Sequence, residues 1–469
     1  MRFMAVATLA VAAPFCPTLT WAQVGPTTSM EVTVYNQNIG LVKDHRTVTL
    51  SEGRSTISFS DVAALIDPTS VHFKSVTDPE GVSILEQNYQ FDLVDRNKLM
   101  QKYLGRDIRI VRYDQDGDVA DELTGTLLGA EGGQPGVVKV GDEILLNPAG
   151  TVILPALPEG LIIKPTLVWD IQADRGGEHE IELSYLTDGL NWEANYVAVI
   201  NADDTQVDLN GWVTLTNMSG ARYPDAKLKL IAGDVRRVQE QPITELNALV
   251  AMGAPKAAAN GFEEQAFFEY HLYTLQRPTT VAENETKQVS LLTAPGVRVT
   301  KRFIFDPEER GRWYGRPPDP KKVKVKIEVR NSEEAGLGMP LPKGKVRVYK
   351  ADPDGALQFV GEDLIDHTPR DEKIDLYIGD AFDIVGERKV MEEKRLGPRV
   401  RQRKVEISLR NHKENDTVTV IAVEHFSGDW TIDQSSAEIA RKDARTGEFT
   451  VTLEPKQETT ITYTVTERW

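Results

Sequence analysis

The sequence predicts an all-β protein: a small N-terminal β domain with an SH3-like barrel, followed by two antiparallel, Ig-like β-sandwiches. Apolar and polar residues alternate with a period of two along most segments, for example at residues 31–35 and 322–330. Turn residues recur between residues 185 and 233 at intervals of about eight to twelve positions, the spacing typical of a β-sandwich. Aromatic and β-branched residues are also too frequent for a disordered chain.

The first 22 residues are predicted to be a signal peptide. Arg2 provides a positive start, residues 3–15 form an apolar run, and Thr20 and Ala22 are the small residues of a cleavage site. The apolar run is too short for a membrane span, which takes about 20 residues, although an uncleaved anchor remains the alternative. We therefore expect export to the periplasm or the extracellular space, with no transmembrane segment after signal removal.

Composition narrows the function classes further. Cys16 is the only cysteine and would leave with the signal, so apolar cores rather than disulfides would hold the mature chain together. The formal net charge of −17 argues against general nucleic-acid binding and favours solubility.

After the signal, the chain is predicted to divide into four units. These are an N-terminal β domain at residues 28–100, a small SH3-like barrel at 101–160, a first β-sandwich at 166–310 and a second at 321–469. The barrel is expected from short apolar runs, each bounded by Gly or Asp. Residues 239–265 are rich in Ala and interrupt the first sandwich, so we predict a mobile insertion there.

The clearest strand of the second sandwich spans residues 322–330. All of its charges fall on one face and all of its aliphatic residues on the other. A one-residue slip in pairing would bury the charged face, so the register of this strand is strongly specified.

Trp192 and Trp212 stand within the alternating stretch of the first sandwich. Their amphipathic rings could line a sugar site. A Trp at such a sandwich position more often fills the core between two sheets, so we expect core positions and a structural role for Trp192.

Two charged motifs have both a functional and a structural interpretation. Asp114, Asp116 and Asp118 could supply oxygen ligands to calcium, but Gly117 does not occupy the position that an EF-hand loop requires. We expect a hairpin turn there instead. The basic stretch at residues 388–404 could bind anionic polymers, and its Gly-Pro break favours a solvated hairpin.

His367 is the histidine with the most suggestive neighbours. It follows Asp366, and a His beside acids could act as a general base. It could equally satisfy buried backbone groups at the end of a strand before Pro369, and we favour that interpretation.

Nucleophilic catalysis finds no support in the sequence. It contains no Gly-x-Ser-x-Gly element, no phosphate-binding Gly-rich loop, and no cysteine beyond the signal. We therefore predict no catalytic, cofactor-binding or metal-binding residues, no cofactor, and no enzymatic activity.

Several motifs resemble those of a known family. They are a Trp with a Tyr four residues on at 192–196, Gly-Trp at 211–212, Asn-x-Ser-Gly at 217–220, Asp-Ala-x-Leu-x-Leu-x-Ala-Gly at 225–233, and His-Thr-Pro at 367–369. Together they resemble a bacterial exported family of unknown function that is related to mucoidy inhibitor A. The resemblance spans nearly the whole mature chain. It implies an exported β protein with a link to exopolysaccharide or to the cell envelope.

The leading hypothesis is a non-catalytic, exported cell-envelope protein that acts through contacts with an unknown envelope protein or a polysaccharide. The alternative is a carbohydrate-active or metal-assisted hydrolase with a site assembled from strand ends near His367. A deep cleft that gathers His367 with two or more carboxylates would favour the enzyme, and flat sandwiches would favour the binding module.

Overall fold

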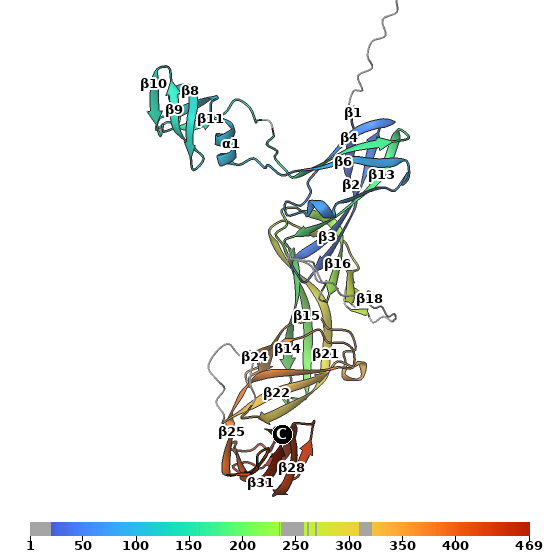
Figure 1. Ribbon diagram of the computed structural model, residues 1–469, viewed down its shortest axis with the longest axis vertical. Helices are drawn as coiled ribbons and strands as arrows, with labels where there is room; N and C mark the ends of the chain where they lie inside the picture. The colour runs from blue at the N-terminus through green and yellow to red at the C-terminus, as the bar shows by residue number, and fades with distance from the viewer. Residues whose placement is uncertain are drawn as a thin grey trace, which may run out of the picture.

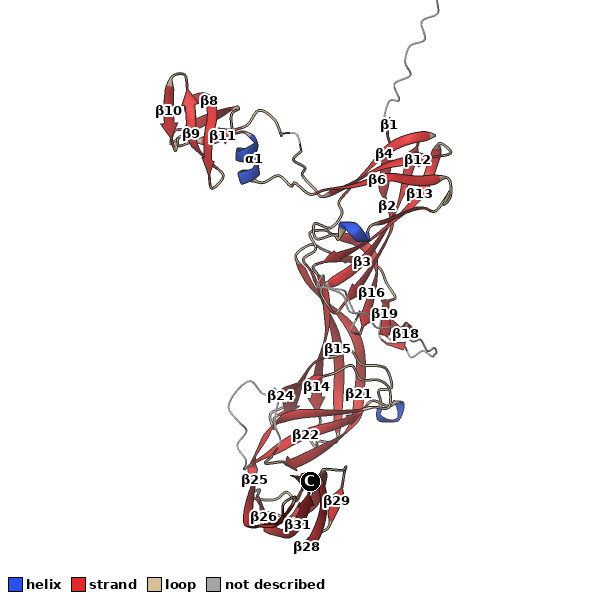
Figure 2. Cartoon of the chain, viewed as in Figure 1, coloured by secondary structure: helices blue, strands red, loops and turns tan. Residues whose placement is uncertain are grey.

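The computed structural model describes residues 20–158, 160–233, 235, 258–259, 262–267, 270–308 and 321–469. Of the residues that the structure describes, 67% lie in strands and 3% in helices, which confirms the predicted all-β class (Figure 2). Figure 1 shows an elongated body with the first strands near one end, the last strands at the other, and a small module held to one side.

The end of the body near the first strands is a sandwich of two sheets. The smaller sheet has the order β1 (Thr20–Trp21), β4 (Gly53–Ser60), β12 (Thr166–Ala173) and β6 (Val82–Gln90). Trp169 of β12 is fully buried, and its ring lies 5.2 Å from that of Phe73 in the facing sheet. Aromatic packing of this kind joins the two layers.

The facing sheet has nine strands. Their order is β17 (Ala258–Ala259), β18 (Phe262–Phe267), β19 (Tyr270–Leu275), β16 (Tyr223–Ala232), β2 (Gln23–Tyr35), β3 (Ile39–Leu50), β13 (Gly177–Asp188) and β5 (His72–Ser75), with β20 (Thr279–Val281) beside β16. Most of the predicted insertion at 239–265 lies outside the described residues, as does most of the predicted signal peptide at 1–22. Among the described residues, no helix is long and apolar enough to cross a membrane.

The other end of the body is a sheet of thirteen strands. Its main order is β24 (Leu357–Ile365), β23 (Gly344–Ala351), β14 (Leu190–Ile200), β15 (Gln206–Asn217), β21 (Glu285–Phe305), β22 (Lys322–Arg330), β25 (Lys373–Gly397), β26 (Val400–Asn411), β31 (Glu458–Arg468) and β28 (Asp429–Ser435). The strands β27 (Val418–His425), β29 (Ile439–Arg441) and β30 (Thr446–Leu453) complete it.

The pairing is not wholly antiparallel, in contrast to the prediction. β14 pairs in parallel with β23, β16 with β2, and β21 with β27. Parallel neighbours require a long connection rather than a hairpin, and each of these pairs joins strands that are far apart in the chain.

Two cores lie within the body. The first draws its buried side chains from residues 32–376, and the second from residues 303–465. β21, β22 and β25 contribute to both cores, and they continue from one into the other. In β22, the aliphatic residues Val323, Ile327 and Val329 are buried, and the charged residues that alternate with them are exposed or half-buried, as the alternation predicts. How the chain divides into independently folding units remains a prediction.

The small module contains α1 (Arg96–Lys102) and a five-stranded sheet. The order of the sheet is β10 (Glu143–Leu146), β9 (Gln134–Val140), β8 (Val119–Glu131), β7 (Asp107–Tyr113) and β11 (Thr151–Ile153). β10 and β11 lie at opposite edges, so these described strands form an open sheet rather than the predicted closed barrel. Met100 in α1 and Tyr103, the residue after α1, pack on Ile108 and Leu127. They cover the side of the core that the remaining strands would cover in a closed barrel.

Candidate functional site

A groove of 610 Å³ lies on the solvent-facing side of the thirteen-stranded sheet, where β14, β23 and β24 meet the turn after β2. Its lining includes Asn191, Asn195, Lys345, Arg347, Leu364 and Asp366. Amide, cationic, anionic and apolar groups thus share one open surface. We call the solvent-facing side of β15, β14, β23 and β24 the outer face.

The register of the four strands arranges the outer face in rows. Trp212 of β15 stands opposite Asn195 of β14, Asn195 lies beside Lys345 of β23, and Lys345 stands opposite Leu364 of β24. Residues paired in this way point to the same side of a sheet and contact each other. The alternate residue Tyr196 is buried in the core beneath, so the row must face outward.

The next row carries compensated charge. Glu362 stands opposite Arg347, and its carboxylate forms an ion pair with Arg347 Nε at 3.3 Å and accepts a hydrogen bond from Lys345 Nζ at 3.4 Å. All three side chains are substantially exposed, so each pair contributes little to stability. The pairs instead hold two cations in place and leave this part of the outer face without a large net charge.

A third row carries aromatic rings. Tyr349 of β23 lies beside Val199 of β14 and opposite Phe359 of β24. The centroids of the two rings are 5.7 Å apart, with their planes at 66°. This edge-to-face arrangement is a favoured aromatic geometry, and it leaves Phe359 55% exposed.

Trp212 is not a core residue, so the expectation that it fills the space between sheets is wrong. Its side chain is 39% exposed, whereas the next residue, Val213, is fully buried. The register explains the difference, because Trp212 shares the outer side with Asn195. Gly211 lets β15 approach its neighbour, since a Cβ there would lie 2.9 Å from Leu292 Cγ.

Trp192 is buried, which confirms its predicted core position. It is 2% exposed, and its Nε1–H donates to the carbonyl oxygen of Ile231 at 3.1 Å. Its ring lies 6.4 Å from that of Tyr273, nearly edge to face. The indole therefore links β14 to the nine-stranded sheet, and its one polar atom is satisfied.

His367 lies behind the groove and contacts two separate segments. Its Nδ1 accepts from the backbone N–H of Lys343 at 3.2 Å, and its Nε2 lies 3.4 Å from the Asn36 amide nitrogen. Because Nδ1 accepts, a neutral ring carries its hydrogen on Nε2. Turning the Asn36 amide would let its buried oxygen, which has no partner among the described residues, accept that hydrogen. The ring thus fastens the turn after β2 to the start of β23.

Asp366 is likewise engaged locally. Its Oδ1 accepts from the backbone N–H of His367 at 2.8 Å, and Thr368 Oγ1 donates to its carbonyl oxygen. These are the bonds of a turn that ends β24. They support the structural interpretation of this motif.

The motif at Asp114 is a hairpin turn between β7 and β8. Asp114 Oδ1 accepts from the backbone N–H groups of Asp116 and Asp118, each at 3.0 Å, and Gly117 has φ +88°. A carboxylate turned onto its own backbone is the usual chemistry of such a turn. In the part of the chain that the structure describes, no three His, Cys, Asp or Glu side chains are grouped to hold a metal.

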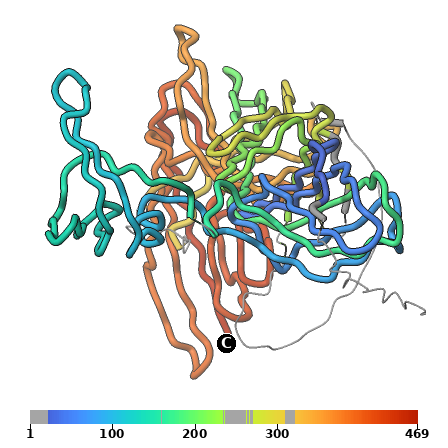
Figure 3. The backbone as a smooth tube through the Cα atoms, turned by 90° about the horizontal axis from the view of Figure 1, so that it is seen from above, coloured from blue at the N-terminus to red at the C-terminus, as the bar shows by residue number. Residues whose placement is uncertain are grey.

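The basic stretch at 388–404 is the hairpin of β25 and β26, whose tip projects from the body in Figure 3. Arg388 Nε donates to the buried Glu424 at 2.8 Å, and Arg403 Nε donates to the buried Glu467 at 3.0 Å. Burial by itself would lower the pKa of Arg388, but Glu424 outweighs it and the pKa is raised. These arginines therefore compensate buried carboxylates and do not form a patch for anionic polymers.

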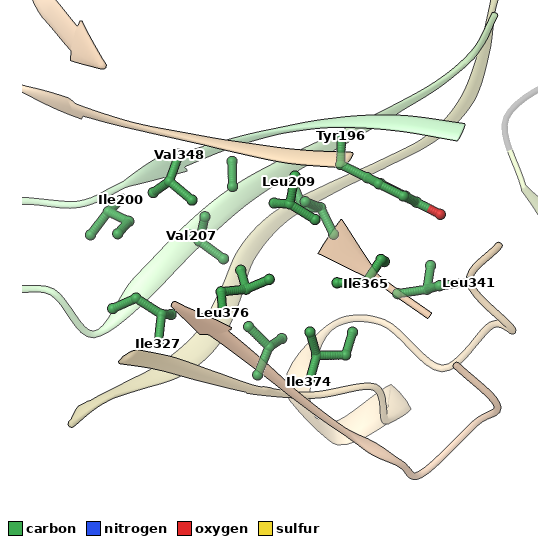
Figure 4. A pocket seen from close by; sticks show the side chains of 13 residues that line it. Tyr196, Ile200, Val207, Leu209, Ile327, Leu341, Val348, Ile365, Ile374 and Leu376 are labelled. Carbon is green, nitrogen blue, oxygen red and sulfur yellow. The ribbon is translucent and has the colours of Figure 1, made fainter. Parts of the chain in front are cut away.

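A cavity also lies inside the first core, beneath the outer face. Figure 4 shows its lining of aliphatic side chains and Tyr196. It offers only 20 Å³, about the space of one water molecule. The Tyr196 hydroxyl donates to the Pro342 carbonyl oxygen at 2.8 Å, and an apolar cavity of this size stays dry. It is a packing feature rather than a ligand site.

Comparison with known protein families places the chain. A family described as a domain of unknown function (DUF4139) matches residues 181–469. The chain belongs to the DUF4139 family. The matched residues contain all four strands of the outer face as well as Trp192 and His367, so the candidate site lies within the family domain. No curated protein matches the chain. The link to mucoidy inhibitor A remains a prediction.

Sequence reasoning missed most of the outer face. Alternation in residues 344–351 already places Lys345, Arg347 and Tyr349 on one side of a strand. Nothing local indicates that this strand would lie in parallel beside β14. The sequence therefore indicated which residues share one side of this strand, but not which residues of other strands lie beside them.

Proposed function

We propose that the protein is a non-catalytic, exported protein of the cell envelope that acts by binding a protein or a polysaccharide. The observation that carries this proposal is the outer face, an open surface of aromatic, amide and compensated charged side chains within the DUF4139 domain. Open sheet faces of mixed polarity suit contact with extended ligands better than they suit a buried reaction centre.

The engagement of the acidic and basic groups supports binding over catalysis. A general base must reach the proton that it removes. The ring nitrogens of His367 contact Lys343 and Asn36, while Glu193 accepts from Asn195 at 3.2 Å. The hydrolase alternative finds its support in Glu193 and Asp366, two carboxylates that line the groove in front of His367.

Replacement of His367 by Gln separates the two functions. A Gln side chain both donates and accepts hydrogen bonds. We therefore expect that a His367→Gln protein, expressed in a strain that lacks the gene, restores the wild-type envelope phenotype. Loss of a general acid or base typically costs about 10²–10⁴ in rate. A folded, exported His367→Gln protein that behaves like the deletion would contradict the non-catalytic proposal.

The proposal of export rests on the signal predicted at residues 1–22. We expect processing after Ala22, which would remove β1 and leave β4 at the edge of its sheet. Mass spectrometry of the purified amino terminus tests this directly. Retention of Met1, or a lipid on Cys16, would overturn it.

A further inference from the structure

We propose that the outer face binds an extended, neutral polysaccharide along a path from Trp212 to the pair Tyr349–Phe359. This inference rests on the proposed function, that the protein works by binding, and adds the class of ligand. It follows from the rings at the two ends of the path and from the polar chemistry between them.

The two aromatic sites are separated by the geometry of the sheet. Trp212 is level with Lys345, and Tyr349 follows Lys345 by four positions along β23. They therefore lie about 13 Å apart along the strands and about 10 Å apart across them. An indole with its partly exposed face and the exposed ring of Phe359 can each stack on the apolar face of a sugar. A chain of several sugars, rather than a single one, would contact both.

Between the rings, the outer face presents hydrogen-bonding groups. Asn195 and Asn210 are half-buried amides. The Asn195 amide nitrogen donates to Glu193 and Thr214, so its oxygen is the atom that can accept from a ligand hydroxyl group, whereas an amide such as that of Asn210 can donate and accept. Arg347 and Lys345 are held by Glu362, so they act as fixed donors and not as free cations. Hydroxyl-rich ligands match such a surface.

Charge decides between neutral and acidic polysaccharides. The central cations share Glu362, and the whole chain carries a formal net charge of −17. A protein with this charge repels polyanions unless it offers them a basic patch. The outer face offers none among its described rows, so a neutral ligand is favoured.

The same rows argue against a protein partner. Lys and Glu are depleted in protein interfaces, and here Glu362 and its partner Lys345 lie on the path between the aromatic sites. The exposed apolar groups are thus divided into two small areas and do not form one continuous patch.

The test uses the full-length processed protein in affinity gel electrophoresis, with a soluble α-glucan, a β-glucan or a galactomannan cast in the gel and alginate as the acidic comparison. We expect retardation by at least one neutral polysaccharide and not by alginate. Trp212→Ala and Phe359→Ala should each weaken it by about tenfold. Phe382→Ala is the matched control, because Phe382 is 91% exposed and lies on β25, which is not one of the four strands of the outer face.

Circular dichroism and Tm should be unchanged in all three variants, since each side chain is exposed. Absence of retardation in all three neutral gels, or equal retardation of Trp212→Ala and wild type, would overturn the inference. Retardation by alginate alone would contradict the inference that the ligand is a neutral polysaccharide. If a purified envelope protein binds instead, and this binding is lost in Trp212→Ala, the ligand is a protein and the inference of a polysaccharide is wrong. The proposed function, binding without catalysis, would still hold. Hydrolysis of the glycan would instead overturn the proposed function.

Discussion

Trp192 and Trp212 lie on neighbouring strands of one sheet, but their surroundings are opposite. Trp192 packs inward and donates to a backbone carbonyl, whereas Trp212 projects outward beside Asn195. The same residue type therefore stabilises the core in one case and is available to a ligand in the other. Which role each plays depends on the side of the sheet that it occupies.

At this scale, Trp192→Ala should lower the free energy of unfolding by about 3–5 kcal/mol. The cost combines lost transfer energy with the cavity left between the sheets, and the Ile231 carbonyl would lose its donor. Urea denaturation followed by circular dichroism measures it. Phe382→Ala serves as the control and should change the value by less than about 0.5 kcal/mol. A Trp192→Ala protein as stable as wild type would show that the indole is not part of the core.

Among the elements, the long strands β21, β22 and β25 matter most, because they carry buried side chains into both cores. The turn between β14 and β15 is fastened to one of these strands, β21, and to β23. Asp204 in that turn accepts from Lys301 of β21 at 2.8 Å and from Lys350 of β23 at 2.5 Å. One carboxylate thus joins the turn between β14 and β15 to two further strands.

This clamp should make stability depend on pH. Burial by itself would raise the pKa of Asp204, but the hydrogen bonds from Lys301 and Lys350 outweigh it and the pKa is lowered. A carboxyl whose pKa is depressed on folding stabilises the protein above its unfolded pKa of about 3.9, and this is lost as the pH falls through the lower folded value.

Asp204→Asn is the test, since Asn tolerates the positive φ of 58° at this position. We expect a loss of about 1 kcal/mol at pH 7, allowing for solvent screening. The difference from wild type should shrink as the pH falls below about 3.9. Urea denaturation at pH 7, 5 and 3 would show this. A difference that stays constant down to pH 3 would mean that the charge of Asp204 does not contribute.

The whole molecule combines the long body with a module that has its own core (Figure 1). The two connections to the module run beside each other, because the Val94 N–H donates to the Ile162 carbonyl oxygen at 2.9 Å and the Ile162 N–H donates to the Asp92 carbonyl oxygen at 3.0 Å. The entry and exit of the module are therefore adjacent.

Replacement of residues 95–160 by a short Gly-Ser linker should leave the body folded. The ends to be joined already lie side by side, and the module shares none of the buried residues of the two larger cores. We expect the Tm of the body to change by no more than a few degrees in calorimetry. Loss of cooperative unfolding would show that the module completes a core of the body.

Local patterns in the sequence determined the features that depend on neighbouring residues. The period of two determined the strands, and with them the sides of β22 on which its aliphatic and charged residues lie. The carboxylate of Asp114 determined the turn that it caps. The motif around Trp192 indicated a core position for this residue and a family of unknown function.

Only the tertiary structure decided what those strands lie beside. Alternation tells which residues share a side of a strand, but not which side faces the core, so Trp192 and Trp212 could not be distinguished. The parallel pairing of β14 with β23 brings Asn195 beside Lys345, although no local signal specifies a partner so distant in the chain. Likewise, Arg388 and Arg403 resemble an anion-binding patch until folding buries Glu424 and Glu467 against them, because a buried carboxylate is stable only when its charge is compensated.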